Sequence, residues 1–115
     1  MTTHLFTLDN IGPRGPTTGE AFVAPTAVLI GDVQIEADVS IWFGAILRAD
    51  DATIYLGTGS NVQDNCVLHV DRKIDADGVA DLEKAAELYR LRWRRFAGGL
   101  QSATLPVGIT TLKGL

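Results

Sequence analysis

The sequence predicts a mainly β fold, a short parallel β-helix with one C-terminal α-helix. The first observation is an aliphatic residue at every sixth position: Val23, Leu29, Ile35, Ile41 and Leu47. A period of six fits neither an α-helix nor an ordinary strand, but it is typical of a β-helix in which each hexad forms one side of a coil. The second observation is an apolar pattern of helical period close to the C-terminal end.

The composition bounds the size and the setting of this protein. A chain of 115 residues, numbered 1–115, has room for a single domain. The net charge of −4 argues against nucleic acid as a partner. No apolar run approaches the ~20 residues that cross a membrane. The start of the chain does not resemble a signal peptide, and Cys66 is the only cysteine. We therefore expect a protein of the reducing cytoplasm.

The predicted coils occupy residues 21–71, and residues 1–20 precede them. This leading segment is rich in Gly, Pro and Thr, so we expect an irregular lead-in that caps the lower end of the solenoid. Within the coils, a small or medium residue stands four positions after each of the first four aliphatic residues: Ala27, Val33, Val39 and Ala45.

The six-residue spacing breaks once. After Leu47 the next inward aliphatic residue is Leu56, nine positions on, and the spacing then resumes at Val62 and Leu68. The three extra residues, around Asp51 to Thr53, are predicted to bulge out at a corner.

The coils are few, which bears on assembly. The segment from 23 to 70 holds roughly two and a half coils, whereas solenoids need about three repeats to be stable. Trp42 and Phe43 are predicted to face outward near a turn, where they leave apolar surface exposed. We therefore expect a homo-oligomer, a trimer, with no membrane and no nucleic acid as partner.

A helix is predicted over residues 78–101. Asp77 is its expected N-cap and the Gly98-Gly99 pair its expected end. An apolar stripe at helical spacing is predicted to pack along the solenoid or on a neighbouring chain: Leu82, Ala86, Tyr89, Trp93, Phe96 and Leu100. The basic run RLRWRR is interpreted as a solvated helix end. For residues 102–115 three alternatives stay open, namely a strand, a partner-binding tail or disorder.

The repeat also predicts which polar side chains share the outer wall. Arg48, Gln63 and His69 each follow an inward aliphatic residue, so they point outward. His69 comes 21 residues after Arg48, and subtracting the three inserted residues leaves 18, one complete coil. Arg48 is therefore expected directly below His69, with Asp50 and Asp64 on the same outer wall.

At these residues the chain resembles the γ-class carbonic anhydrases, which are trimeric left-handed β-helix proteins. The resemblance extends over residues 21–71, and its specific motifs are SIWFGAILRAD and the N-V-Q-D…L-H run. The helix with AAELYRLRWRRFAGGL is similar to the C-terminal helix of that family. The left-handed sense of the coil is implied by the resemblance alone, since crossover connections are usually right-handed.

The resemblance also implies roles for individual residues. Arg48, Asp50 and Asp64 would form a buried ion network that orients subunits. Gln63 and Asn61 would lie near a metal-bound water.

His69 would be the first zinc ligand of a three-histidine site. The other two histidines of the family pattern do not follow, because the sequence passes from His69 into the helix and His4 is the only other histidine. A catalytic zinc needs three protein ligands and a water. We therefore predict a shortened, oligomeric and non-catalytic relative that lacks the middle coils. The alternative is a minimal zinc-dependent carbonic anhydrase whose metal site is completed across subunits.

Overall fold

The computed structural model describes residues 4–70 and 85–112 of the chain, which form two sheets and a helix. The strands are β1 (Leu5–Thr7), β2 (Ala21–Val23), β3 (Val28–Ile35), β4 (Ser40–Ile41), β5 (Ile46–Leu56), β6 (Asn61–Val62), β7 (Val67–Val70), β8 (Gln101–Ser102) and β9 (Ile109–Thr110), and the helix is α2 (Ala85–Gly99). No helix among the described residues is long and apolar enough to cross a membrane.

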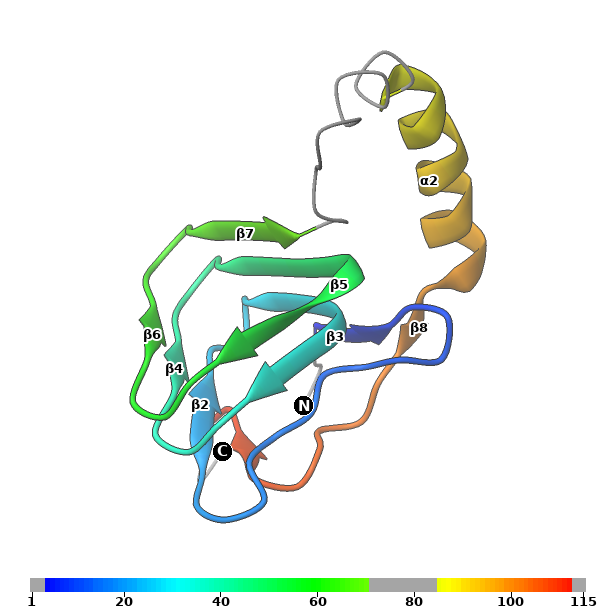
Figure 1. Cartoon of the computed structure of the whole chain (residues 1–115). Coiled ribbons are helices and arrows are strands. Elements are labelled where there is room, and N and C mark those ends of the chain that lie inside the picture. Colours follow the sequence, from blue (N-terminus) through cyan, green and yellow to red (C-terminus); the bar gives the residue numbers. More distant parts are fainter. Residues whose placement is uncertain (1–3, 71–84, 113–115) are drawn as a thin grey trace.

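The strands stack as the coils of a short parallel β-helix (Figure 1). One sheet has the order β7-β5-β3-β1-β8 and the other the order β6-β4-β2-β9, with strands one coil apart as neighbours. The second halves of the long strands β3 and β5 bend away and form the third wall, where Arg14 bridges Gln34. The predicted fold class is confirmed.

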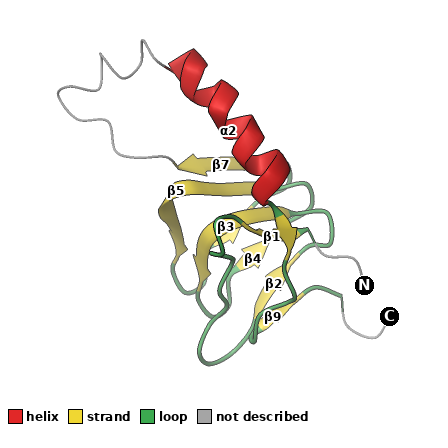
Figure 2. Ribbon diagram, turned by 90° about the vertical axis from the view of Figure 1, so that its right-hand side faces the viewer, coloured by secondary structure: helices red, strands yellow, loops and turns green. Residues whose placement is uncertain are grey.

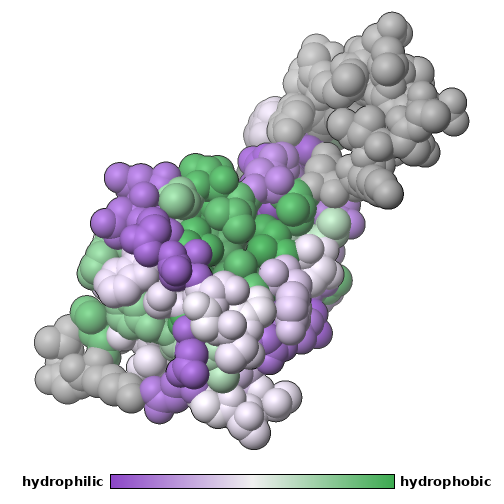
Figure 3. Space-filling model, turned by 60° about the vertical axis from the view of Figure 1, so that its left-hand side comes forward, coloured by the Kyte–Doolittle hydropathy of each residue, from purple (hydrophilic) through white to green (hydrophobic). Residues whose placement is uncertain are grey.

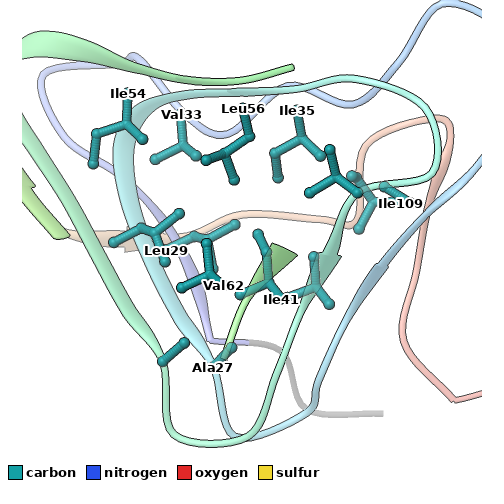
Figure 4. Close-up of a cluster of buried hydrophobic side chains, with 14 of the residues drawn as sticks. Ala27, Leu29, Val33, Ile35, Ile41, Ile54, Leu56, Val62 and Ile109 are labelled. Atoms are coloured by element: carbon teal, nitrogen blue, oxygen red, sulfur yellow. The ribbon is translucent and has the colours of Figure 1, made fainter. Parts of the chain in front are cut away.

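The core lies inside the coils, and its members are the residues of the six-residue repeat. Leu29, Ile35, Ile41 and Leu47 are 0% exposed. Figure 4 shows that the side chains of several of these residues point into the interior from all three walls. In-register pairing stacks Leu5, Leu29, Leu47 and Leu68 in one column. Burial of each such side chain contributes about 1.5–3 kcal/mol, so the column holds the coils in register.

The predicted bulge is confirmed at the bend between β3 and β5. Gly31 pairs with Ala49 and Val33 pairs with Ile54, so Asp32 alone stands opposite the four residues 50–53, which is three more than a regular coil needs. Gly31 has a φ of 78°, and a Cβ at this position would collide with the carbonyl oxygen of Ala49. The bend therefore depends on a glycine.

The lead-in is not irregular throughout, contrary to the expectation for residues 1–20. Leu5–Thr7 forms β1, which pairs with β3 in parallel. The physical reason is burial, because Leu5 is 2% exposed and continues the leucine column one coil downward. A single three-residue strand is too short to produce a visible period.

The segment after the helix resolves into strands, the first of the three alternatives. β8 pairs antiparallel with β1, and β9 pairs in parallel with β2. Ile109 enters the core from β9 and is 7% exposed. The lower end of the solenoid is therefore closed by both ends of the described chain.

The helix α2 lies beside the coils (Figure 2), and it leads directly into β8 (Figure 1). The last helical residue is Gly99, which agrees with the glycine pair Gly98-Gly99 as the expected end of the helix. The predicted range 78–101 is therefore two residues too long at this end. The predicted start at residue 78 and the N-cap Asp77 lie outside the described residues. Fifteen residues of α-helix are about 22 Å long, enough to reach from β8 to β7 across four strand spacings.

Candidate functional site

Arg48 and His69 meet on the outer wall of the coils. They are register partners on β5 and β7, which confirms the expected placement of Arg48 below His69. The Arg48 Nη2 atom lies 2.8 Å from Nε2 and 3.1 Å from Nδ1 of the imidazole. A neutral imidazole has one nitrogen without a proton, and Arg48 donates to that nitrogen.

Asp50 is the centre of the charged contacts at this wall. Its side chain is 0% exposed, and it lies 3.4 Å from Arg48 Nε, 3.3 Å from His69 Nε2 and 3.4 Å from Arg92 Nε. A buried carboxylate is tolerated when cationic groups and hydrogen-bond donors surround it. The basic side chains of β5, β7 and α2 therefore converge on one buried charge.

A second arginine of α2 contacts the same corner. Arg95 donates to Asp51 Oδ1 at 3.1 Å and to the Asp50 carbonyl oxygen at 3.2 Å, and it forms an ion pair with Asp9. Partial burial opposes the charge of Arg95, but hydrogen bonds to Asp9 and Asp51 outweigh this effect and raise the pKa of the guanidinium above its ordinary value. The interpretation of this basic run as a solvated helix end is wrong for Arg92 and Arg95.

Within residues 91–99, Phe96 of the predicted apolar stripe faces the wall, but Trp93 does not. Trp93 is 59% exposed, whereas Phe96 lies against the wall with its ring centroid 5.8 Å from the Arg48 guanidinium carbon. The wall that the helix meets is charged, so arginines turn toward it and Trp93 turns away. A cleft of ≈ 200 Å³ remains between wall and helix, lined by Arg48, Arg92, Trp93 and Phe96.

The remaining predicted site residues lie on the other sheet and the following turn. Gln63 Nε2 donates to Asn61 Oδ1 at 2.6 Å, beside β6. Asp64 accepts a hydrogen bond of 3.2 Å from the backbone N–H of Phe43. The structure thus groups Arg48 with Asp50 and His69, and Asn61 with Gln63. Within one chain, the described contacts of Asp64 do not include Arg48 or Asp50.

The described donors do not fit a zinc site. Both nitrogens of His69 face the Arg48 guanidinium, and a second cation would be repelled at this position. Within residues 4–70 and 85–112, His, Cys, Asp and Glu form no group of three that could hold a metal ion. His4 precedes β1, and β1 is about 14 Å from β7, three strand spacings away.

A further polar cluster at the bend was missed by the sequence analysis. The Thr53 hydroxyl donates to Asp32 at 2.5 Å, and Arg14 pairs with Asp32 at 2.7 Å. The bond from Thr53 is the main reason that the pKa of Asp32 is lowered, with Arg14 adding to it against the effect of partial burial. The sequence spacing could have predicted this contact, because Thr53 follows Asp32 by 21 residues, the same spacing by which His69 follows Arg48.

Comparison with known proteins places the chain among hexapeptide-repeat relatives. It is 49% identical over 65 residues to Gamma carbonic anhydrase 1, mitochondrial, from Arabidopsis thaliana, a match that covers 56% of this chain and 24% of that protein. It is 52% identical over 50 residues to Carnitine operon protein CaiE from Salmonella newport, which covers 44% of this chain and 25% of that protein. It is also 48% identical over 50 residues to Gamma carbonic anhydrase-like 1, mitochondrial, from Arabidopsis thaliana (44% of this chain and 20% of that protein).

The matched segment covers only part of this chain and only part of each relative. The chain spans about a quarter of the length of the first two of these relatives, and no family model matches it. The identity nevertheless extends over about half of the chain, in a protein whose coils carry the six-residue core. The resemblance is therefore confirmed: over about half of its length, this chain is similar to γ-carbonic anhydrases and to CaiE.

Proposed function

We propose that this chain is a non-catalytic, oligomeric relative of the γ-carbonic anhydrases. The observation that supports this most directly is the state of His69. Its imidazole contacts both Arg48 and Asp50, and the Arg48 guanidinium lies within 3.1 Å of both ring nitrogens, the atoms through which a histidine binds a metal ion. A zinc-bound water reaches a pKa near 7 only when three protein ligands hold the metal. We propose that His69 serves here as a polar link between two coils.

The alternative is a minimal carbonic anhydrase completed by symmetry-related chains. In that case His69 would turn away from Arg48 and bind zinc, and Gln63 and Asn61 would orient the bound water. The hydrogen bond from Gln63 to Asn61 preorganises this amide pair, and it is the specific observation in favour of this alternative.

Metal content and hydration activity separate the two functions. We expect untagged protein, purified and then incubated with zinc, to hold far less than one zinc per chain and to hydrate no carbon dioxide above buffer. His69→Ala should leave both values unchanged, as should the control His4→Ala on the lower coil. Zinc near one per chain, together with hydration activity that His69→Ala abolishes, would establish the enzyme instead.

We propose that the assembly is a trimer formed through the outer walls. Phe43, Ile46 and Val67 are exposed apolar side chains near one corner, and Ile46 and Val67 are register partners. Figure 3 shows an apolar area between hydrophilic side chains in the upper part of the face that it presents. Arg48 and Asp50 on one chain and Asp64 on the next would supply charge complementarity across the boundary.

Sedimentation equilibrium tests the assembly. We expect a mass three times that of one chain at high protein concentration, and dissociation in Val67→Asp, which places a charge in the apolar contact. The control Tyr55→Asp adds the same charge to an exposed side chain on the third wall and should leave the trimer intact. Wild-type protein and variants with a detached α2 that all stay monomeric up to the solubility limit would overturn this proposal.

We further propose that residues 1–115 fold as one domain and that the protein acts in the cytoplasm. Both ends of the described chain close the same lower coil, which supports a single cooperative unit. The lone Cys66 suits a reducing compartment. One unfolding transition in calorimetry and a cytosolic signal after cell fractionation are expected. Two transitions would contradict the first expectation, and recovery in mitochondria the second.

A further inference from the structure

We propose that α2 is an autoinhibitory strap that competes with a neighbouring subunit for the outer wall of the coils. This inference rests on the proposed assembly, because it concerns the wall through which chains would associate. The strap covers the polar half of that wall, where Arg48, Asp50 and His69 meet. A second chain and α2 cannot contact this half at the same time.

Among residues 91–99, the contacts of α2 with the wall are mainly ionic. Arg92 lies 3.4 Å from Asp50 and 3.5 Å from Asp51, and Arg95 binds Asp51 and Asp9. Phe96 adds one aromatic contact with the Arg48 guanidinium. Leu91 and Trp93 are more than half exposed, so the apolar side chains in the middle of α2 contribute little to its attachment.

The packing beneath the strap is incomplete. A cleft of ≈ 200 Å³ remains there, lined by Arg48 of the wall and by Arg92, Trp93 and Phe96 of α2. Next to the covered half, the same two strands expose Ile46 and Val67. The wall thus has an apolar half that is exposed and a charged half that α2 covers. A partner subunit that contacts both halves would have an apolar contact with a polar rim, as protein interfaces usually do.

The C-terminal end of the strap is tethered to the coils. Its last turn contains Gly98 and Gly99, and the next residues form β8, which is paired with β1. When the arginine contacts break, α2 can therefore swing about this glycine pair while β8 holds its place. The tether keeps the helix at high effective concentration, so α2 closes again unless another chain occupies the wall.

Charge reversal at Arg95 tests the strap. Arg95→Glu places a carboxylate against Asp9 and Asp51, and it leaves Arg48, Asp50 and the apolar half of the wall unchanged. We expect the concentration at which half of the chains are associated, measured by sedimentation equilibrium, to fall at least ten-fold. Hydrogen exchange at the amides of α2 should speed up in the monomer, since the helix spends more time detached from the wall.

Two further variants complete the experiment. Arg94→Glu makes the same charge change on the exposed side of α2 and should leave the midpoint near the wild-type value. Arg95→Glu combined with Asp51→Arg restores an opposite-charge pair and should return the midpoint toward the wild type. Circular dichroism and thermal unfolding confirm that each variant is folded.

The outcomes separate the strap from the proposed assembly. A wild type that associates with the same midpoint as Arg95→Glu would overturn the strap and leave the assembly standing. An equal shift in Arg94→Glu would also overturn it, because net charge rather than the contact would then be responsible. Wild type and variants that all stay monomeric would overturn the assembly and, with it, the competition.

Discussion

Asp50 shows how one residue connects the coils with the helix. It belongs to β5, its side chain is fully buried, and basic groups from β5, β7 and α2 surround it. Among the described residues the Asp50 Oδ1 atom is buried without a hydrogen bond, although Arg48 Nε lies 3.4 Å away. A buried carboxylate of this kind loses its hydration, and this cost offsets most of what its ion pairs contribute to stability. Its main effect is to fix the positions of the basic side chains around it.

The pH dependence of stability should depend on Asp32. Because the pKa of Asp32 lies below its ordinary value of 3.8 in the folded state, its ionised form stabilises the fold fully above pH 3.8, and this contribution is lost as the pH falls through the lowered pKa. In Asp32→Asn the free energy of unfolding should therefore fall less steeply between pH 4 and pH 2. Urea unfolding at a series of pH values measures this slope.

A second variant identifies the cause. Thr53→Val removes the hydroxyl that lowers the pKa of Asp32 most, and it should flatten the acid limb in part while keeping the carboxylate. Wild-type and Asp32→Asn curves that run parallel down to the acid transition would contradict this account.

Gly31 should tolerate no side chain. Gly59→Ala is the control, because a Cβ at Gly59 would meet no atom within 4 Å. This variant should lose only about 1–2 kcal/mol of unfolding free energy, the cost of a left-handed backbone conformation for a residue with a side chain. Gly31→Ala adds a collision with the Ala49 carbonyl oxygen and should lower the free energy of unfolding by clearly more. Equal losses in the two variants, measured by urea unfolding, would mean that the bend relaxes around the new methyl group.

At the scale of the element, β5 displays the alternation that the repeat predicts. Leu47 is 0% exposed, whereas its neighbour Ile46 is exposed on the outer wall. Leu47→Ala should lower the free energy of unfolding by about 2–5 kcal/mol because it leaves a cavity in the leucine column. Ile46→Ala should cost less than about 1 kcal/mol when measured on dilute, monomeric protein. A similar loss in both would show that β5 is not held in this register.

Helix α2 marks the limit of prediction from an apolar period. The apolar period correctly indicates a helix, which is observed over Ala85–Gly99, but within residues 91–99 the side chains that contact the wall are those of Arg92, Arg95 and Phe96. Which face turns inward depends on the partner surface, and the partner here is a charged wall built by residues some 40 positions earlier. A helical period alone contains no information about that surface.

At the scale of the whole molecule, the lower end depends on the tail. Ile109 on β9 is buried beneath the core, whereas Val107, two residues before it, is 89% exposed. Ile109→Ala should lower the melting temperature and cost about 2 kcal/mol of unfolding free energy, and Val107→Ala should change it by less than ~0.5 kcal/mol. A tail that contributes no stability would give the same small effect for both variants.

The coils and the pair Arg48–His69 followed from the sequence because a periodic backbone turns sequence distance into spatial distance. An offset of 18 residues, or 21 across the bulge, is one coil, and the same rule accounts for the contacts of Arg14 with Asp32 and of Asp32 with Thr53. The contacts of Asp50 with Arg92 and of Asp51 with Arg95 follow no such offset. They required the helix, the bulge and the wall to be in place together.

The β-helix, its inward residues, the position of its bulge and its resemblance to the γ-carbonic anhydrases could be predicted from the sequence, because each depends on local spacing or on a motif. Three features became evident in the folded chain alone: the tail after the helix closes the lower coil, α2 turns Arg92 and Arg95 inward, and Asp50 rather than His69 is the centre of the charged cluster. These features arise where segments without a common period meet, and there burial and charge select the contacts.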